Sequence, residues 1–167
     1  MPLWAMQKLW HFWRKNKMAK KTLLLYHSFD RKFDDVYEHI LNFKKFGDVH
    51  PYMKKVTELS KIEPNSTNYE VKEKVFLLGF VKTKPVYKAK VIELEAQKHI
   101  RYFSHIKSAF LLNIDFVFSE NGLNTAFNLT ERIEIKGNPL LIVYFASILK
   151  KTHLQTFENL RKQLKTS

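Results

Sequence analysis

Residues 138–165, NPLLIVYFASILKKTHLQTFENLRKQLK, decide the fold of this chain. Asn138 and Pro139 predict the start of a helix, because asparagine is a favourable N-cap residue and proline is tolerated at the first helical position. Neither glycine nor a second proline follows before Lys165. The stretch therefore predicts one long helix that closes the chain and buries an apolar side against another element.

The chain before this helix is rich in predicted strands. A first strand is expected at 23–29, apolar on both faces, and two short helices at 33–41 and 43–49. The further strands are expected at 52–62, 68–76, 84–94, 98–107, 110–119 and 123–136. Asn121-Gly122 is a strong signal for a hairpin between the last two. This order predicts an α+β fold in which a long helix lies across a curved, seven-stranded antiparallel sheet.

The composition is that of one globular domain. The 167 residues are 45% hydrophobic and 14% aromatic, enough to bury a sizeable core. The absence of cysteine excludes disulfides, thiolate catalysis and cysteine-ligated metal, and it suits a reducing cytoplasm. The longest uncharged apolar run, Leu140 to Leu149, has half of the roughly 20 residues that a bilayer requires. We therefore expect a cytoplasmic protein that can associate peripherally with a membrane.

The N-terminal residues differ in character from the rest. Residues 1–21 hold six of the basic residues, no acidic residue and all three tryptophans, in a chain of net charge +13. On a helical wheel, the apolar residues of 1–17 face away from most of the lysines and arginines, a pattern typical of membrane-surface helices. We assign 1–21 to a basic tail and 22–167 to a ligand-binding domain. The alternative is a frayed or non-native extension before Met18.

Three local motifs resemble those of a known superfamily. They are Phe29-Asp30 followed by 33–37 (FDDVY), residues 46–51 (FGDVHP), and residues 153–160 (HLQTFENL). Together with the order of elements, they resemble the helix-grip fold of the START, pathogenesis-related allergen and polyketide cyclase/dehydrase (SRPBCC) superfamily. The resemblance covers about 22–165. It implies an internal cavity that holds a hydrophobic ligand, and in some members an enzyme activity.

Motifs for familiar chemistry are absent from the sequence. The four glycines cannot form a P-loop or GxGxxG, and neither GxSxG nor HExxH is present. The seven histidines form no i, i+4 pair, and His99 and His105 are too far apart on one strand to chelate the same ion. We therefore expect neither a metal nor a cofactor.

Two acidic residues fall on apolar strand faces, where a carboxylate must be paired, hydrogen-bonded or protonated. Glu131 shares a face with Leu129 and Ile133, and Glu73 shares one with Val71. His27, on the first strand, can reach Glu131, because the first and last strands are neighbours in the sheets of this superfamily. Glu131, Glu73 and His27 are thus the catalytic candidates, and a structural ion pair or a strand end open to water is the alternative.

Two patterns indicate which residues would surround a ligand. One is the alternation of side chains along the strands, and the other is a stripe of apolar side chains along the closing helix. Thr152, His153 and Thr156 interrupt the stripe of the closing helix, and we expect this polar interruption to lie over a cavity. A second stripe, Leu141, Tyr144 and Ile148, needs another partner, such as mouth loops, the tail, a second subunit or lipid. The candidate ligand-binding residues are Glu131, Glu73, Tyr87, Tyr102, Phe116, Phe127, Phe145 and His153.

Three functions compete. The leading interpretation is the binding, or transport, of a hydrophobic or amphipathic small molecule such as a lipid or polyketide-like compound in an internal cavity. The alternative is an enzyme of the cyclase, dehydratase or hydrolase type that uses an inward glutamate and a histidine as acid and base. Scattered lysines disfavour nucleic-acid binding. We expect a monomer or a weak homodimer, with peripheral membrane contact through residues 1–17.

Overall fold

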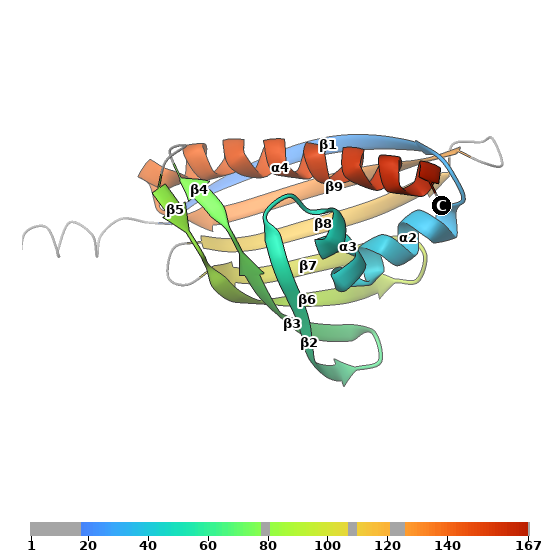
Figure 1. Ribbon diagram of the computed structural model, residues 1–167, viewed down its shortest axis with the longest axis horizontal. Coiled ribbons are helices and arrows are strands. Elements are labelled where there is room, and N and C mark those ends of the chain that lie inside the picture. The colour runs from blue at the N-terminus through green and yellow to red at the C-terminus, as the bar shows by residue number, and fades with distance from the viewer. Residues whose placement is uncertain (1–17, 78–80, 107–109, 121–125, 167) are drawn as a thin grey trace, which may run out of the picture.

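In the computed structural model, a curved antiparallel sheet wraps around one long helix (Figure 1). The structure describes residues 18–77, 81–106, 110–120 and 126–166. The chain enters the sheet with β1 (Ala19–Asp30), forms the two short helices α2 (Phe33–Leu41) and α3 (Phe43–Val49), returns to strands, and ends in α4 (Pro139–Thr166). The predicted α+β helix-grip architecture is confirmed.

The main sheet has seven strands in the order β1-β9-β8-β7-β6-β3-β2, and all neighbours are antiparallel. Its remaining strands are β2 (Met53–Glu63), β3 (Ser66–Glu73), β6 (Val86–Glu95), β7 (His99–Ile106), β8 (Phe110–Glu120) and β9 (Ala126–Gly137). Because β1 pairs with β9 along its full length, the first and last strands lie side by side at one end of the sheet, under α4 (Figure 1).

The long helix packs on the concave face of the sheet through residues spaced four apart. Leu149, His153 and Phe157 are all buried on this side of α4, and Ile142 and Leu160 extend the same face. Two polar contacts fix the C-terminal half of the helix. Asn159 Nδ2 donates to the Val49 carbonyl at 2.8 Å, and Arg161 Nε donates to the Ser28 carbonyl at 3.3 Å. The helix is therefore held against both α3 and β1.

The two short helices form a compact corner against the sheet. Asn42 ends α2 and caps α3, because its side-chain oxygen accepts hydrogen bonds from the backbone N–H groups of Lys44 and Lys45. Phe43 and Phe46 of α3 are buried among the aromatic side chains of the sheet. This packing holds α3, and the chain that leaves it, close to the middle of α4.

The structure differs from the sequence prediction in three places. β1 begins at Ala19, before the predicted strand start at residue 23. Only one face of β1 is buried, since Leu24 and Tyr26 are 53% and 73% exposed, whereas the prediction had both faces apolar. The predicted strand at 68–76 is interrupted at Lys74, and its last part forms a separate two-stranded sheet from β4 (Val75–Leu77) and β5 (Val81–Thr83).

Some predictions fall outside the described residues. They concern the basic tail at 1–17 and the hairpin at Asn121-Gly122. Within the described ranges, no helix is both long enough and apolar enough to span a bilayer.

Candidate functional site

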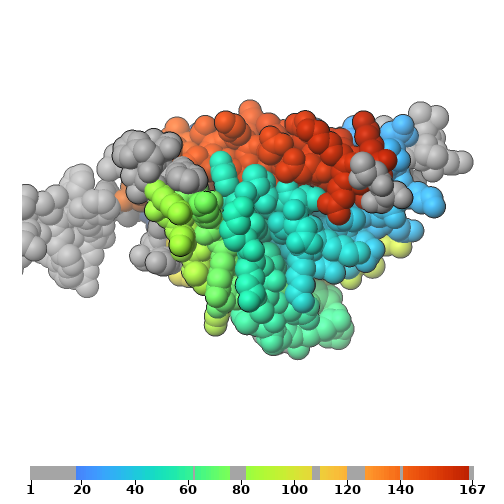
Figure 2. All heavy atoms as spheres, viewed as in Figure 1, coloured from blue at the N-terminus to red at the C-terminus, as the bar shows by residue number. Residues whose placement is uncertain are grey.

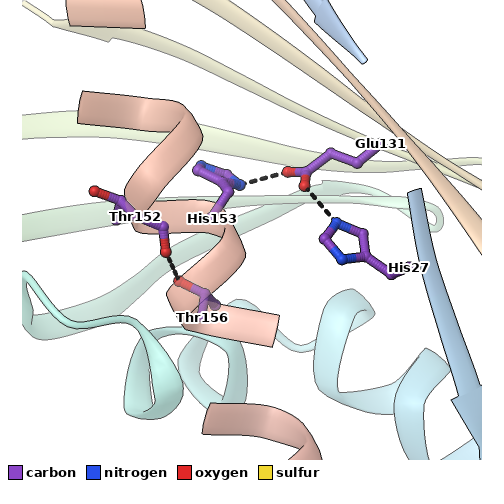
Figure 3. Close-up of polar contacts among 5 residues, drawn as sticks. All are labelled: His27, Glu131, Thr152, His153 and Thr156. Carbon is purple, nitrogen blue, oxygen red and sulfur yellow. Dashed lines mark hydrogen bonds and ion pairs between the residues drawn. The ribbon is translucent and has the colours of Figure 1, made fainter. Parts of the chain in front are cut away.

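A buried carboxylate between two histidines lies at the centre of the molecule. Glu131 of β9 is fully buried, and His27 of β1 and His153 of α4 are each only 3% exposed. Glu131 Oε2 lies 3.0 Å from His27 Nε2, and Glu131 Oε1 forms a hydrogen-bonded ion pair with His153 Nδ1 (Figure 3). The first strand thus meets the last strand and the closing helix, far away in sequence, in one polar cluster within an otherwise apolar core.

The two histidines keep Glu131 ionised. Burial alone raises the pKa of this carboxyl, because the interior solvates a charge poorly. The positive charge and hydrogen bond of His153, followed by those of His27, outweigh burial and lower the pKa of Glu131 below its usual value. The carboxylate therefore accepts a hydrogen bond at each oxygen, which is the arrangement that a buried charge requires.

Two threonines, Thr152 and Thr156, lie close to His153 on α4. His153 lies between Leu149 and Phe157 on the helix face that meets the sheet. One turn farther along, Thr156 Oγ1 donates to the Thr152 carbonyl at 2.9 Å, so this hydroxyl is satisfied within the helix (Figure 3). The second ring nitrogen of His153 points away from Glu131 (Figure 3).

Beside this cluster is a cavity of about 70 Å³ between α4 and the concave face of the sheet. A single water needs roughly 10–15 Å³ by this measure, so several waters or a small organic group fit. On the face of the molecule that Figure 2 shows, β2 and β4 lie next to α4. The cavity is lined by Phe43, Phe46, His50, Tyr52, Met53, Glu73, Val75, Tyr87, Ala89, Tyr102, Ser104, Ile106, Leu112, Ile114, Phe145, Ile148, Leu149, Thr152 and His153.

His50 contributes a second imidazole to the cavity. It follows α3, is 8% exposed, and its ring centroid lies 6.1 Å from that of His153. Its Nδ1 accepts hydrogen bonds from the backbone N–H groups of Tyr52 and Met53, at 3.3 and 3.1 Å. Burial, reinforced by the nearby charge of His153, lowers the pKa of His50 to about 3, although the charge of Glu131 acts in the opposite direction.

A carboxyl and a phenol from two neighbouring strands provide a second polar group in the lining. Tyr87 Oη donates to Glu73 Oε1 at 2.6 Å. Burial raises the pKa of Glu73, and the hydrogen bond from Tyr87 and the charge of His153 only partly offset this effect. Burial beside Glu73 also raises the pKa of Tyr87 well above its usual value. The cavity therefore holds a carboxyl that protonates more easily than Glu131 does.

The structure brings most of the predicted site residues together. Five of them line the cavity, namely Glu73, Tyr87, Tyr102, Phe145 and His153. Glu131 and His27 lie behind His153 and are not in the lining. Phe116 and Phe127 are buried in the aromatic core, against Tyr102 and Phe29 respectively, and are also outside the lining.

Among the lining residues that were not candidate site residues, His50 and Ile148 differ most from their place in the sequence prediction. His50 appeared there only as part of a helix-ending motif, and no sequence signal reports that its ring turns inward. Ile148 belonged to the stripe expected to need an outside partner, but it lines the cavity. Of the other members of that stripe, Leu141 is 50% exposed and Tyr144 is half-buried. Among the described residues, no group of three histidine or acidic side chains is arranged to hold a metal ion.

Comparison with known proteins supports the fold through structure rather than sequence. No protein-family model matches the chain, and no curated protein matches it either. The Zhui aromatase/cyclase from Streptomyces sp. R1128 is similar in structure, with a TM-score of 0.72 at 10% identity over 88% of this chain and 94% of that one.

Two other solved structures are similar over most of their length. Norcoclaurine synthase from Thalictrum flavum has a TM-score of 0.65 at 12% identity, covering 90% of this chain and 89% of that chain. A protein of Thermus thermophilus has a TM-score of 0.69 at 11% identity, covering 87% of this chain and 98% of that chain. At such identities the likeness establishes the fold alone. The chain has the helix-grip fold, as the order of elements and the sequence motifs predicted.

Proposed function

We propose that this protein binds a hydrophobic or amphipathic small molecule between the sheet and α4. One observation carries the proposal, namely that a cavity with mostly apolar walls lies beside a small set of ordered polar groups. Ligand sites in proteins commonly have this composition, because apolar walls provide affinity and a few polar groups fix orientation. Known ligand-binding and cyclase-type neighbours share the same fold, which supports the proposal at the level of architecture.

The cavity is small, so a larger ligand can enter only if part of its wall moves. About 70 Å³ accommodates only a small group without movement of the walls. β4 and β5 form a two-stranded sheet separate from the main one, and Val75 of β4 lines the cavity. We propose that β4 and β5 move away from α4 when a larger ligand enters.

A cavity-filling substitution tests the binding function. Ser104, on β7, is buried in the lining, so Ser104→Leu fills part of the cavity. Ser147, on α4, is exposed, so Ser147→Leu adds the same side chain outside it. The wild type and Ser147→Leu should increase the fluorescence of N-phenyl-1-naphthylamine, an uncharged apolar probe, and Ser104→Leu should not. Equal fluorescence with all three folded proteins would contradict the proposal.

An acid–base enzyme is the second candidate function. It is favoured by the burial of Glu131 and by the position of His153, which contacts this carboxylate and also lines the cavity. A histidine backed by a carboxylate can take up and return a proton during a reaction. Deuterium incorporation into the natural ligand in D2O, catalysed by the wild type but not by His153→Gln, would support an enzyme. Equal incorporation with both proteins would contradict it.

We also propose peripheral membrane contact near the start of α4. Ala19 pairs with Gly137, so the basic, tryptophan-rich residues 1–17 join the domain next to this helix. Leu141 and Val143 on α4 are 50% and 61% exposed. Exposed apolar residues together with a basic segment suit an anionic membrane surface, because lipid can cover the apolar side chains while the lysines remain at the headgroups.

A further inference from the structure

β1 forms one edge of the main sheet, and one of its faces is exposed along most of the strand (Figure 1). Among the described residues, its only strand neighbour is β9. From Lys20 to Asp30 every second residue is exposed, on the convex face of the sheet that points away from α4. Two of these residues are large and apolar. Leu24 is 53% exposed, and Tyr26 is 73% exposed, the highest value for a large apolar side chain in the described part of the chain.

The two edges of the sheet differ in the features that keep an edge strand from pairing with another chain. β2, at the opposite edge, has three irregularities in its register on β3 and carries Lys54, Lys55 and Lys61. Bulges and lysines are common means of protecting an edge strand. β1 instead pairs with β9 over all of its 12 residues without a register shift. It therefore has the form of an edge that accepts another strand.

α4 contacts the backbone of β1 close to the end of the strand. Arg161 Nε donates to the Ser28 carbonyl at 3.3 Å, and the Arg161 guanidinium lies 4.9 Å from the centre of the Phe29 ring. This hydrogen bond is exposed and longer than the usual range of about 2.7–3.2 Å. An arginine side chain can turn away without movement of its helix, so a backbone N–H group of an added strand can replace this contact.

The sequence of β1 is complementary to itself when two copies run antiparallel. Residues 20–30 read KKTLLLYHSFD. When Leu25 lies on a two-fold axis, Leu24 lies opposite Tyr26 of the second copy, and Lys20 lies opposite Asp30 of the second copy. Each of these pairs occurs twice, because the symmetry repeats it. Apolar pairs and opposite charges directly across an antiparallel pair of strands are stabilising.

Other registers lose this complementarity. A shift by one residue places the exposed face of one strand beside the buried face of the other, because side chains alternate with a period of two. The two nearest registers that keep the faces aligned place Asp30 opposite Met18 or opposite Thr22, and neither of these residues is charged. The register centred on Leu25 is therefore favoured by both charge and apolar contact.

Lys20 can exchange its present partner for Asp30 of a second copy. It contacts Glu134 of its own chain, but its side chain is 52% exposed. Glu134 also contacts Lys136 at 3.3 Å, so this carboxylate keeps a cation when Lys20 turns away. Asp30 is itself exposed at the end of β1.

We propose that two copies of this chain associate through β1, in the antiparallel register centred on Leu25. Their main sheets then become continuous, and β1, which carries His27 to Glu131, becomes an interior strand in both copies. A second copy suits this edge better than an unrelated peptide does, because the strand is complementary to its own sequence.

The same substitution on each edge tests which strand associates. Tyr26→Lys places a lysine opposite Leu24 of the second copy, whereas Leu59→Lys changes a residue of β2 that is 48% exposed. Sedimentation velocity of the full chain over a range of concentrations gives the dissociation constant of each dimer. We expect Tyr26→Lys to weaken association about tenfold or more and Leu59→Lys to behave as the wild type. A wild type that is monomeric at every concentration, or an equal effect of the two substitutions, would overturn the proposal.

Reversal of charges tests the register. Lys20→Asp and Asp30→Lys each place like charges opposite one another at two points of the dimer, so each should weaken association about threefold to tenfold. The double variant Lys20→Asp/Asp30→Lys restores opposite charges and should associate as the wild type does. A double variant that is weaker than either single variant would refute the register.

Cross-linking measures the register directly, since the natural chain has no cysteine. Thr22 lies opposite Ser28 of the second copy, with Cβ atoms about 5 Å apart, whereas the two copies of Thr22 are roughly 20 Å apart along the strands. A short bismaleimide should therefore join an equal mixture of Thr22→Cys and Ser28→Cys chains far more than either variant alone. The same yield from all three samples would rule out this arrangement. None of the changed residues lines the cavity, so these results do not depend on ligand binding.

Discussion

Glu131 and His153 form a buried ion pair between the last strand of the sheet and the helix that packs on it. The two residues are 22 positions apart in sequence and almost completely shielded from solvent, since Glu131 is fully buried and His153 is 3% exposed. Such a pair sets the position of α4 against the sheet and orients the ring that faces the cavity. Its contribution to stability and to binding can be measured separately.

Replacing Glu131 by glutamine should destabilise the protein by about 3–5 kcal/mol, because the two buried imidazoles lose their counter-charge. Chemical denaturation of Glu131→Gln, His153→Gln and the double variant measures this effect. We expect the double variant to be about 1–3 kcal/mol more stable than the sum of the single changes predicts, as contacting residues couple. Additive losses would show that the pair does not act as a unit.

Acid should destabilise the protein in two steps. The pKa of His50 is lowered to about 3 in the folded state, so between roughly pH 6.5 and pH 3 the unfolded state binds the extra proton. Stability therefore falls with decreasing pH in this window, by about 1 kcal/mol per pH unit from this group. Glu131, whose pKa is also lowered, adds a loss that begins below its unfolded pKa of roughly 4.5 and continues as the pH falls through its folded pKa.

His50→Asn isolates the first step, since it removes the titrating ring while Glu131 remains. Urea denaturation at a series of pH values between roughly 6.5 and 5 should give a shallower slope of unfolding free energy for this variant than for the wild type. Identical slopes would refute the assignment of His50 as a buried neutral ring.

Gly47 should not tolerate a side chain, although alanine usually stabilises a helix. A Cβ atom at this position of α3 would lie 2.6 Å from Val56 Cγ2 on β2. We expect Gly47→Ala to cost about 1–3 kcal/mol, as overpacking of a core does. Adding Val56→Ala should restore part of this loss in thermal denaturation. A Gly47→Ala variant as stable as the wild type would mean that β2 packs less closely on α3.

The tail should strengthen binding to anionic membranes. We expect the full chain to float with phosphatidylserine-containing liposomes and a Trp10→Ala/Trp13→Ala variant to float several-fold less, because tryptophan anchors a basic segment at the interface. Leu141→Ser/Val143→Ser tests the helix contribution separately. Equal flotation of all three proteins would contradict membrane contact at this end of the molecule.

Much of the fold could be predicted from sequence, for identifiable reasons. Asn138 and Pro139 marked the start of α4, and strand alternation marked Glu131 as a carboxylate on a buried face. These signals are local periodicities, which sequence carries directly. The partnership of Glu131 with His27 was expected from the superfamily's strand order, and the register of β1 on β9 places the two within hydrogen-bonding distance.

The rest depended on tertiary packing that sequence does not encode locally. His50 ends a short helix, and only the packing of α3 on the sheet turns its ring into the cavity. Phe116 and Phe127 have the alternation of ligand-facing residues, but other aromatic rings cover them. The interruption of the strand after Glu73 was also not visible, because no proline or glycine marks it.

Native mass spectrometry of protein isolated from its own host tests the central claim most directly, with wild type and Ser104→Leu measured side by side. We predict that the wild type retains one small hydrophobic or amphipathic molecule, and that Ser104→Leu has the mass of the bare chain. A wild type with the mass of the bare chain, or a ligand held equally by both proteins, would contradict the account.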